Sequence, residues 1–301
     1  MQKTLISIIG STGIGKTKLA IEMAKHFGTE IISCDSRQFF KEMKIGTATP
    51  TDEELAQAKH HFIGHLSVQD YYSIGQYEED ALEKIEEIFE KNDFAVLVGG
   101  SMMYEKAVVE GLNDLPEANA ENQEKLQKIW DEEGLEKLQE ILKNLDEEYY
   151  NVVHKENPRR LLRAIDVIWQ TGRKYSEIIA EPKHKRDFKV VRIGITAPRE
   201  IMYERINLRV DKMLENGLID EVKSLTEYQK LVPLQTVGYT EIFKYLEGTW
   251  DLDFAIEEIK KNSRRYAKRQ ETWNRKVENV TWLPYDYSEE QLHEILSKIE
   301  K

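Results

Sequence analysis

The residues best suited to chemistry stand in a glycine-rich segment close to the amino terminus. They fit the pattern G-x-x-x-x-G-K-[ST] of a P-loop and are Gly10, Ser11, Thr12, Gly13, Ile14, Gly15, Lys16 and Thr17. In such a loop, glycines let successive backbone N–H groups point at one phosphate, and the helix that follows adds its dipole. Lys16 supplies a mobile positive charge and the Thr17 hydroxyl can ligate Mg²⁺. The segment therefore predicts a polyphosphate-binding site.

The P-loop alone does not decide which polyphosphate is bound, and a nucleotide such as ATP is compatible with it. Phosphate-hydrolysing P-loop proteins pair the loop with an apolar strand that ends in an aspartate supporting Mg²⁺. The best candidate here, Ala95–Val98, ends in Gly99-Gly100-Ser101 instead. We therefore expect no motor or switch function, whereas a small-molecule kinase remains possible.

A second set of polar residues follows another apolar run, Ile31–Cys34, and consists of Asp35, Ser36, Arg37 and Gln38. The carboxyl ends of parallel strands line one crevice, so Asp35 and Ser101 are expected to converge with the P-loop. A carboxylate beside a diphosphate would oppose its binding. A general base is the better reason for Asp35, although capping of the following helix or turn is an alternative.

Charge is unevenly distributed along the chain. The net charge of −12 argues, taken alone, against a nucleic-acid partner. Residues 131–148 are dominated by acids, however, while residues 260–276 hold eight cations against Glu271 alone. On a helical wheel at ~100° per residue, one face of 256–276 lies opposite Ile256, Ile259, Tyr266 and Trp273. The cations on this face are Lys261, Arg264, Arg265, Lys268, Arg269, Arg275 and Lys276. We expect this helix to present its basic face to RNA phosphates.

The elements that must position these residues follow from the apolar runs. Short unalternated runs at Leu5–Ile9, Ile31–Cys34, Ala95–Val98 and Val190–Ile195 alternate with helical patterns. Such runs are typical of buried parallel strands joined by crossover helices. The predicted class is α/β with a doubly wound sheet. Residues 115–189 are nearly strand-free and helical in pattern, so we expect a helical insertion between core segments 1–114 and 190–301.

The amino-acid composition indicates the environment in which the protein works. The chain of 301 residues has one cysteine, Cys34, which excludes an internal disulfide framework. No apolar run approaches the ~20 residues that span a bilayer, and the first residues do not resemble a signal peptide. We expect a monomer in the cytoplasm that does not bind membranes.

Ordered motifs along nearly the whole chain resemble the tRNA dimethylallyltransferase (tRNA isopentenyltransferase) family. They are GSTGIGKT at 10–17, DSRQ at 35–38, KIGTATP at 44–50, HHFIGHL at 60–66, VGGSMMY at 98–104, NPRRLLRAIDV at 157–167, RVDKMLENGLIDEV at 209–222, VGYTE at 237–241 and RRYAKRQETWNR at 264–275. The sequence departs from the usual pattern in four places. Ser11 replaces a common proline, Ser101-Met102-Met103 a frequent Thr-Gly-Leu, Arg159 a glutamine, and Asn274 an aromatic residue.

The resemblance implies a P-loop kinase-like core with a helical insertion that closes on RNA. It also implies transfer of a dimethylallyl group from dimethylallyl diphosphate to N6 of the adenosine immediately 3′ of the anticodon in tRNA, with Mg²⁺. Catalytic roles would go to Asp35 as base and to Lys16, Thr17 and Arg209 at the leaving diphosphate, with a further contact from Ser101. The adenine must leave its stack, and Gln38 suits an adenine edge.

The tRNA contacts expected from position in the family form a larger set. They are Asp35, Ser36, Arg37, Gln38, Ser101, Gln123, Arg159, Arg160, Leu161, Leu162, Arg163, Gln235, Thr236, Val237, Gly238, Tyr239 and Thr240, with Arg265, Lys268, Arg269, Trp273 and Arg275 on the basic helix. Two other readings stay open. A kinase of a nucleoside or small metabolite would explain the P-loop and Asp35 but not the basic helix. A non-catalytic RNA-binding module with a relict P-loop would bind tRNA whatever the state of Lys16 and Asp35.

Overall fold

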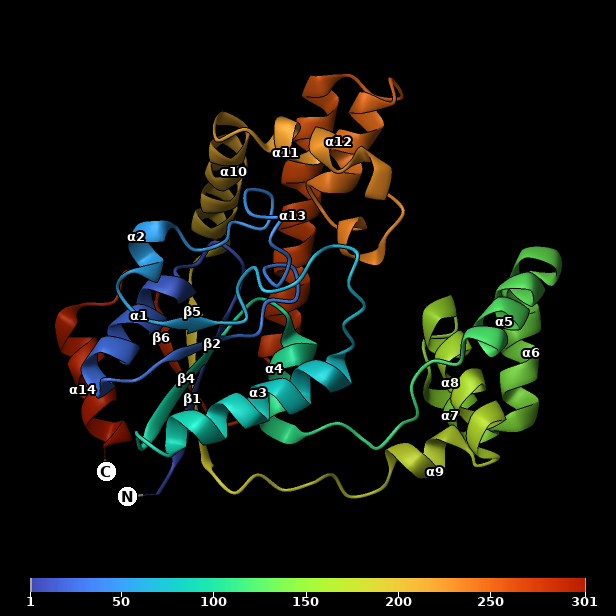
Figure 1. The fold of residues 1–301 in the computed structure, drawn as a ribbon, viewed down its shortest axis with the longest axis horizontal. Helices are drawn as coiled ribbons and strands as arrows, with labels where there is room; N and C mark the ends of the chain where they lie inside the picture. The colour runs from blue at the N-terminus through green and yellow to red at the C-terminus, as the bar shows by residue number, and fades with distance from the viewer. Residues whose placement is uncertain (1, 301) are drawn as a thin grey trace. The chain divides into compact units, whose positions relative to one another are not determined.

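The computed structural model describes residues 2–300 and divides into two compact units. One unit combines the residues up to Val109 with those from Arg186 onward, and the other is Glu110–Lys185. The first unit holds the sheet and the second is helical (Figure 1).

The centre of the first unit is a six-stranded sheet in the order β3-β2-β4-β1-β5-β6. All neighbouring strands pair in parallel. The strands are β1 Thr4–Gly10, β2 Ile31–Ser33, β3 His60–His61, β4 Phe94–Val98, β5 Lys189–Thr196 and β6 Val280–Pro284. The predicted α/β class with a doubly wound parallel sheet is confirmed. Strands β3 and β6, at the two edges, were not predicted.

Side chains alternate across the strands, so each face of the sheet builds its own core. Leu5, Ala95 and Leu97 join one cluster with α3, Ile74–Phe89, and α4, Met102–Glu110. Ile6 and Val96 join another with α1, Lys16–Phe27, and α14, Glu289–Ile299. The continuous apolar runs of the central strands therefore reflect burial on both faces.

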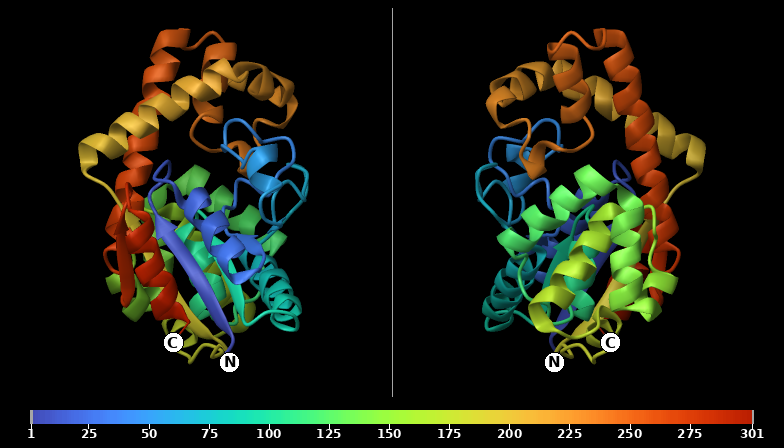
Figure 2. Two further views of the ribbon diagram at one scale, coloured as in Figure 1. Left: turned by 90° about the vertical axis from the view of Figure 1, so that its left-hand side faces the viewer. Right: turned by 90° about the vertical axis from the view of Figure 1, so that its right-hand side faces the viewer.

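A group of helices stands at the carboxyl end of the strands (Figure 1). Its members are α10 Arg199–Glu215, α11 Leu218–Ser224, α12 Tyr239–Leu246 and α13 Leu252–Asn274, with the short turns η1 Thr226–Tyr228 and η2 Val232–Leu234. The long helix α13 packs on α10, on α12 and on β1, and Figure 2 shows it running past the sheet. A short helix, α2, covers Asp52–Leu55.

The second unit has its own apolar core, made by residues such as Leu126, Leu138, Leu161 and Ile165. Its helices are α5 Ala120–Glu133, α6 Leu135–Leu145, α7 Glu147–Val152, α8 Pro158–Thr171 and α9 Tyr175–Ile179. The amino terminus of α8 is stabilised because Asn157 caps it and Pro158 occupies its first turn. Among residues 2–300, no helix is long and apolar enough to cross a membrane.

Candidate active site

The P-loop connects the buried strand β1 to helix α1. Gly13 has φ of 75° and Gly15 has φ of 111°, a backbone conformation that side chains with a Cβ rarely adopt. The side chain of Lys16 folds over the loop, where its Nζ donates to the carbonyl oxygens of Gly10 and Ser11 at 3.0 and 2.9 Å. The segment therefore has the form that the motif requires of a phosphate-binding loop.

A cavity of about 360 Å³ opens beside the P-loop. Its wall combines the loop with the ends of β2 and β4 and with α10, and includes Thr12, Gly13, Gly15, Lys16, Thr17, Asp35, Gln38, Gly99, Gly100, Arg205 and Arg209. This volume lies in the range of ligand pockets, which are ~300–1,000 Å³. The predicted convergence of Asp35 with the P-loop is therefore seen in the structure, and we call this space the P-loop cavity.

Two cations face this cavity from different elements. Arg209 of α10 donates through Nη1 to Thr12 Oγ1 at 3.0 Å and through Nη2 to the Thr47 carbonyl at 3.1 Å. Burial lowers the pKa of Lys16 to about 8, with nearby Asp35 raising it and Arg209 lowering it further. Burial also lowers the pKa of Arg209, which stays charged because arginine starts so high. The cavity is thus prepared for an anion.

Asp35 lies across the cavity wall at the end of β2. Its Oδ1 accepts from the backbone N–H of Arg37 at 3.2 Å, which fixes the carboxylate at the start of the turn. A Cβ on Gly100 would lie 2.9 Å from Asp35 Oδ2, so only glycine leaves room for this carboxylate there. Asp35 also interacts electrostatically with Lys16 and Arg209. A carboxylate held beside cations in a cavity can accept a proton.

The next residues of the DSRQ segment are held by neighbouring loops. The Ser101 hydroxyl accepts from the Ser36 N–H at 2.9 Å and lies 2.9 Å from the Ser36 hydroxyl, so Ser101 positions this turn from the start of α4. Arg37 donates to the Val232 carbonyl. Gln38 donates its amide N–H groups to the carbonyls of Thr47 and Ala48 at 3.3 and 3.1 Å. The predicted pairing of Gln38 with an adenine edge stays a prediction, and in this structure the amide donors are bonded to these two carbonyls.

Helix α13 contributes a buried glutamine that sequence reasoning missed. Gln270 is fully buried, and its Oε1 accepts from the Thr12 N–H at 2.8 Å while its Nε2 donates to the Gly100 carbonyl at 2.8 Å. Tyr266 donates to the same carbonyl at 3.0 Å. These bonds tie the P-loop to the Gly99-Gly100 turn. A polar residue on the inward face of a long helix was the available signal.

The loop that carries Thr47 is held by α11 and α12. Glu221 accepts from the backbone N–H groups of Lys44, Ile45 and Gly46 at 2.7–2.9 Å. Tyr239 donates its hydroxyl to the same carboxylate at 2.6 Å and is fully buried. The expected RNA contact of Tyr239 stays a prediction, and in this structure the ring packs on Gly46 while the hydroxyl is bonded to Glu221.

The other residues of the 235–240 segment differ in exposure. Gln235 is exposed, Thr236, Val237 and Thr240 are half-buried, and Gly238 is buried. Gln235 donates to the Gln229 carbonyl and Thr240 to the Thr236 carbonyl. Gln235 is therefore the one residue of this set that is exposed, and its amide is bonded to a neighbouring turn.

The predicted RNA-facing set on α8 splits in two. Leu161 and Leu162 are buried in the core of the second unit, and their expected RNA contact stays a prediction. Arg163 is half-buried and donates to the Pro116 carbonyl at 2.5 Å and to buried Asp166 at 3.4 Å. Arg159 and Arg160 are exposed beside a surface hollow. Gln123, on α5, is half-buried.

The basic residues of α13 also fall into two groups, those exposed to solvent and those bonded to a neighbouring helix. Arg265, Lys268 and Arg269 are exposed, as are Arg275 and Lys276 just beyond the helix end. Arg264 instead donates to Asn207 of α10 at 2.7 Å, so its predicted place on the basic face is wrong. Trp273 is half-buried under Lys106, whose Nζ lies 5.7 Å from the ring centroid. On the opposite face of α13, the buried residues include Ile259, Ala267, Gln270 and Asn274.

The P-loop cavity suits Mg²⁺ only as a partner of bound phosphate. Within residues 2–300 no group of three or more His, Cys, Asp or Glu side chains could hold a metal ion. The Thr17 hydroxyl lines the cavity at the start of α1. Mg²⁺ is commonly held by one or two protein oxygens together with substrate phosphates and water. The residues therefore fit an ion that arrives with a diphosphate.

Fold and site together define a class of protein. A parallel α/β sheet with a P-loop, a carboxylate facing it and no aspartate after β4 describes a P-loop kinase-like transferase without the hydrolytic arrangement. A family profile described as IPP transferase matches residues 38–277.

Known proteins narrow this class to one family. The chain is 49% identical to the tRNA dimethylallyltransferase of Christiangramia forsetii, over 99% of each chain. It is 36% identical to the solved tRNA isopentenylpyrophosphate transferase of Bacillus halodurans, with a TM-score of 0.73 over 99% of this chain and 96% of that one. A eukaryotic dimethylallyltransferase acting on tRNA is 27% identical with a TM-score of 0.85, over 98% of this chain and 79% of that one. The chain belongs to the tRNA dimethylallyltransferase family.

Proposed function

We propose that this protein transfers a dimethylallyl group from dimethylallyl diphosphate to N6 of the adenosine 3′ of the anticodon in tRNA, releasing diphosphate. The observation that carries the proposal is one cavity in which Asp35 faces a P-loop and two cations, Lys16 and Arg209. Family membership supports the same reaction. The single cysteine agrees with a reducing cytoplasm, where we expect the protein to act as a monomer.

The departure of diphosphate is the first chemical requirement. The bond between the allylic carbon and the bridging oxygen breaks, and negative charge develops on the leaving oxygens. The P-loop N–H groups, Lys16 and Arg209 are placed to stabilise that charge, which is the largest contribution in many enzymes. Mg²⁺, held with the diphosphate at Thr17, would add Lewis-acid charge stabilisation.

Activation of the weak nucleophile is the second chemical requirement. The lone pair of the adenine N6 amine is delocalised into the ring, so the amine must lose a proton as its bond to carbon forms. Asp35 is the carboxylate that can accept this proton. A target base reaches such a cavity only when it leaves the stack of the RNA. Asp35 is fixed by Arg37 N–H, and Ser101 holds the adjoining turn, so the base is oriented before substrate arrives.

Product analysis tests the proposal directly. Unmodified tRNA, dimethylallyl diphosphate and Mg²⁺ are incubated with the protein, and nucleosides are then analysed by mass. We expect a dimethylallyl adenosine at the position 3′ of the anticodon and an equal amount of diphosphate, both dependent on tRNA. Transfer of phosphate from ATP to an acceptor, without prenylated nucleoside, would instead support a small-molecule kinase.

A further inference from the structure

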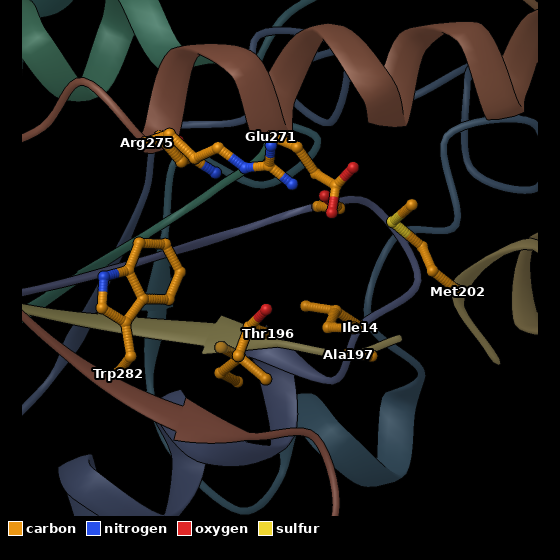
Figure 3. Close-up of a pocket in the computed structure, with 10 residues that line it drawn as sticks. Ile14, Thr196, Ala197, Met202, Glu271, Arg275 and Trp282 are labelled. Carbon is orange, nitrogen blue, oxygen red and sulfur yellow. The ribbon is translucent and has the colours of Figure 1, made fainter. Parts of the chain in front are cut away.

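A second cavity of about 190 Å³ lies between the last turns of α13 and strands β5 and β6. We call it the α13 cavity. It is lined by Ser11, Ile14, Ile195, Thr196, Ala197, Met202, Glu271, Asn274, Arg275 and Trp282, none of which lines the P-loop cavity. Figure 3 shows Glu271 and Arg275 reaching from the helix, with Trp282 and Met202 at opposite ends of the space. The reaction derived above uses none of these side chains.

Polar groups without partners mark this cavity as a built site. Asn274 is only 5% exposed, yet its side-chain amide has no hydrogen-bond partner within residues 2–300. In the same described part of the chain, neither the Glu271 carboxylate nor the Arg275 guanidinium has a hydrogen-bond or ion-pair partner. Among the described residues, His60 Nε2 is the one buried side-chain polar atom without a partner, so the polar atoms of Asn274 are open to the cavity and not sealed in the core. A ligand with complementary polar edges would satisfy all three groups.

The tryptophan supplies a rigid flat wall. A Cβ on Gly194 would lie 2.4 Å from a ring atom of Trp282, so the ring packs directly on the backbone of β5. Trp282 is nevertheless 42% exposed as a residue. An aromatic ring held in place and still accessible is the platform on which nucleobases stack.

The size of the α13 cavity and the charge of its lining limit the class of ligand that it can bind. Pockets for whole drug-sized molecules are ~300–1,000 Å³, so 190 Å³ suits one planar ring system that belongs to a larger molecule. The Glu271 carboxylate only accepts hydrogen bonds, which favours a base with an amino group, and the Asn274 amide both donates and accepts. Exposed Lys268, Arg275 and Lys276 lie nearby in sequence and carry the charge that phosphates require.

We propose that the α13 cavity binds one unstacked nucleobase that carries an exocyclic amino group, stacked on Trp282 and bonded to Glu271 and Asn274. The base can belong to the RNA substrate or to a free nucleotide, and the first source rests on the proposed function. The cavity would then add a base-specific contact outside the reacting centre.

The test compares Trp282→Leu and Asn274→Phe, which fills the cavity, with wild type, with the conservative variant Trp282→Phe and with the distant control Trp250→Leu. Affinity is measured by direct titration, without prenyl donor, for an anticodon stem-loop RNA and for its abasic versions at each loop position. Binding of AMP, CMP, GMP and UMP is measured in parallel. Thermal unfolding and binding of dimethylallyl diphosphate report whether the fold and the P-loop remain intact.

For an RNA base, we expect Trp282→Leu and Asn274→Phe to weaken RNA binding by roughly 5- to 100-fold. The slope of affinity against salt should not change, because no phosphate contact is lost. Trp282→Phe should retain most affinity, and one abasic position should weaken binding to wild type but not to these two variants. For a free nucleotide, the same variants should lose binding of AMP, CMP or GMP while RNA binding stays unchanged.

The proposal is overturned if wild type binds the RNA, no abasic position is coupled to Trp282 or Asn274, and none of the four nucleotides binds the cavity. Preferential binding of UMP over AMP, CMP and GMP would contradict the assigned role of Glu271. A wild-type protein that does not bind the tRNA stem-loop at all would count against the proposed function instead, which keeps the two failures apart.

Discussion

Lys16 is the P-loop residue whose charge depends on the surroundings that the fold provides. Its amine is held between the backbone carbonyls of Gly10 and Ser11, and burial together with Arg209 opposes its protonation. Asp35 acts in the other direction. The motif predicted a cation here, whereas the shifted pKa depends on α10 and β2, which the motif does not describe.

Diphosphate affinity should therefore fall as pH rises through about 8, the pKa of Lys16 in the free protein. Below that pH the lysine is already charged, and above it binding of the anion must be accompanied by uptake of a proton from solvent, which lowers the affinity. Isothermal titration with diphosphate from pH 6.5 to 9.5, without added Mg²⁺, measures this. In Lys16→Arg the cation stays protonated, so the decline should disappear. An identical decline in both proteins would contradict the assignment.

Gln270 should contribute to stability through two buried backbone groups. In Gln270→Leu the Thr12 N–H and the Gly100 carbonyl lose this side chain as a partner. Each unpaired buried group costs about 1–3 kcal/mol, although Tyr266 still donates to Gly100. We expect the free energy of unfolding in urea to fall by about 2 kcal/mol. Tyr266→Phe, which removes only the second donor to the Gly100 carbonyl, should lose less, and equal losses would argue against this bonding scheme.

At the scale of elements, α13 has two functions that its sequence pattern only partly separates. Its inward face joins the P-loop to the Gly100 turn through Gln270, while Arg265, Lys268 and Arg269 remain exposed. The wheel correctly placed these exposed cations. It misplaced Arg264, because α10 supplies Asn207 as a partner, and periodicity within one helix contains no information about a neighbouring helix.

Removing two exposed cations of α13 should weaken tRNA binding without affecting the small substrate. In Arg265→Ala/Lys268→Ala, each lost phosphate contact should flatten the log–log salt slope by somewhat under ~1 unit and raise the tRNA KM. Binding of dimethylallyl diphosphate alone should be unchanged. Lys25→Ala/Lys298→Ala removes the same charge from exposed positions on α1 and α14 and should leave the slope at the wild-type value. Equal slopes in all three proteins would show that α13 does not contact the RNA backbone.

At the scale of the whole molecule, a strand could be predicted from the sequence only where its own residues form a recognisable pattern. The central strands β1, β4 and β5 were evident because burial on both faces produces continuous apolar runs. The edge strand β6 was not predicted because Thr281 and Trp282 are exposed, which interrupts the apolar run. The edge strand β3 was not predicted because it spans only His60–His61. The cavity at the strand ends followed from parallel topology, which brings distant strand ends together.

The parts of the site that could not be predicted depend on pairings across the chain. Glu221 and Tyr239 hold the loop at 44–46 over long sequence separations, and nothing in a motif shows that Tyr239 is used for this purpose. Family position alone suggested RNA contacts for Leu161 and Leu162, but the apolar periodicity of α8 buries both. Residues close in sequence to a binding motif can thus serve the core.

The central claim is that Asp35 removes the proton from an adenine amine while the P-loop holds the leaving diphosphate. Single-turnover rates of wild type and Asp35→Asn, with saturating unmodified tRNA, dimethylallyl diphosphate and Mg²⁺, test it most directly. Asparagine keeps the shape of the side chain but cannot act as the base, so we expect the rate to fall by ~10²–10⁴-fold with tRNA affinity little changed. A near-wild-type rate of dimethylallyl adenosine formation in Asp35→Asn would contradict the account and leave Asp35 a structural role.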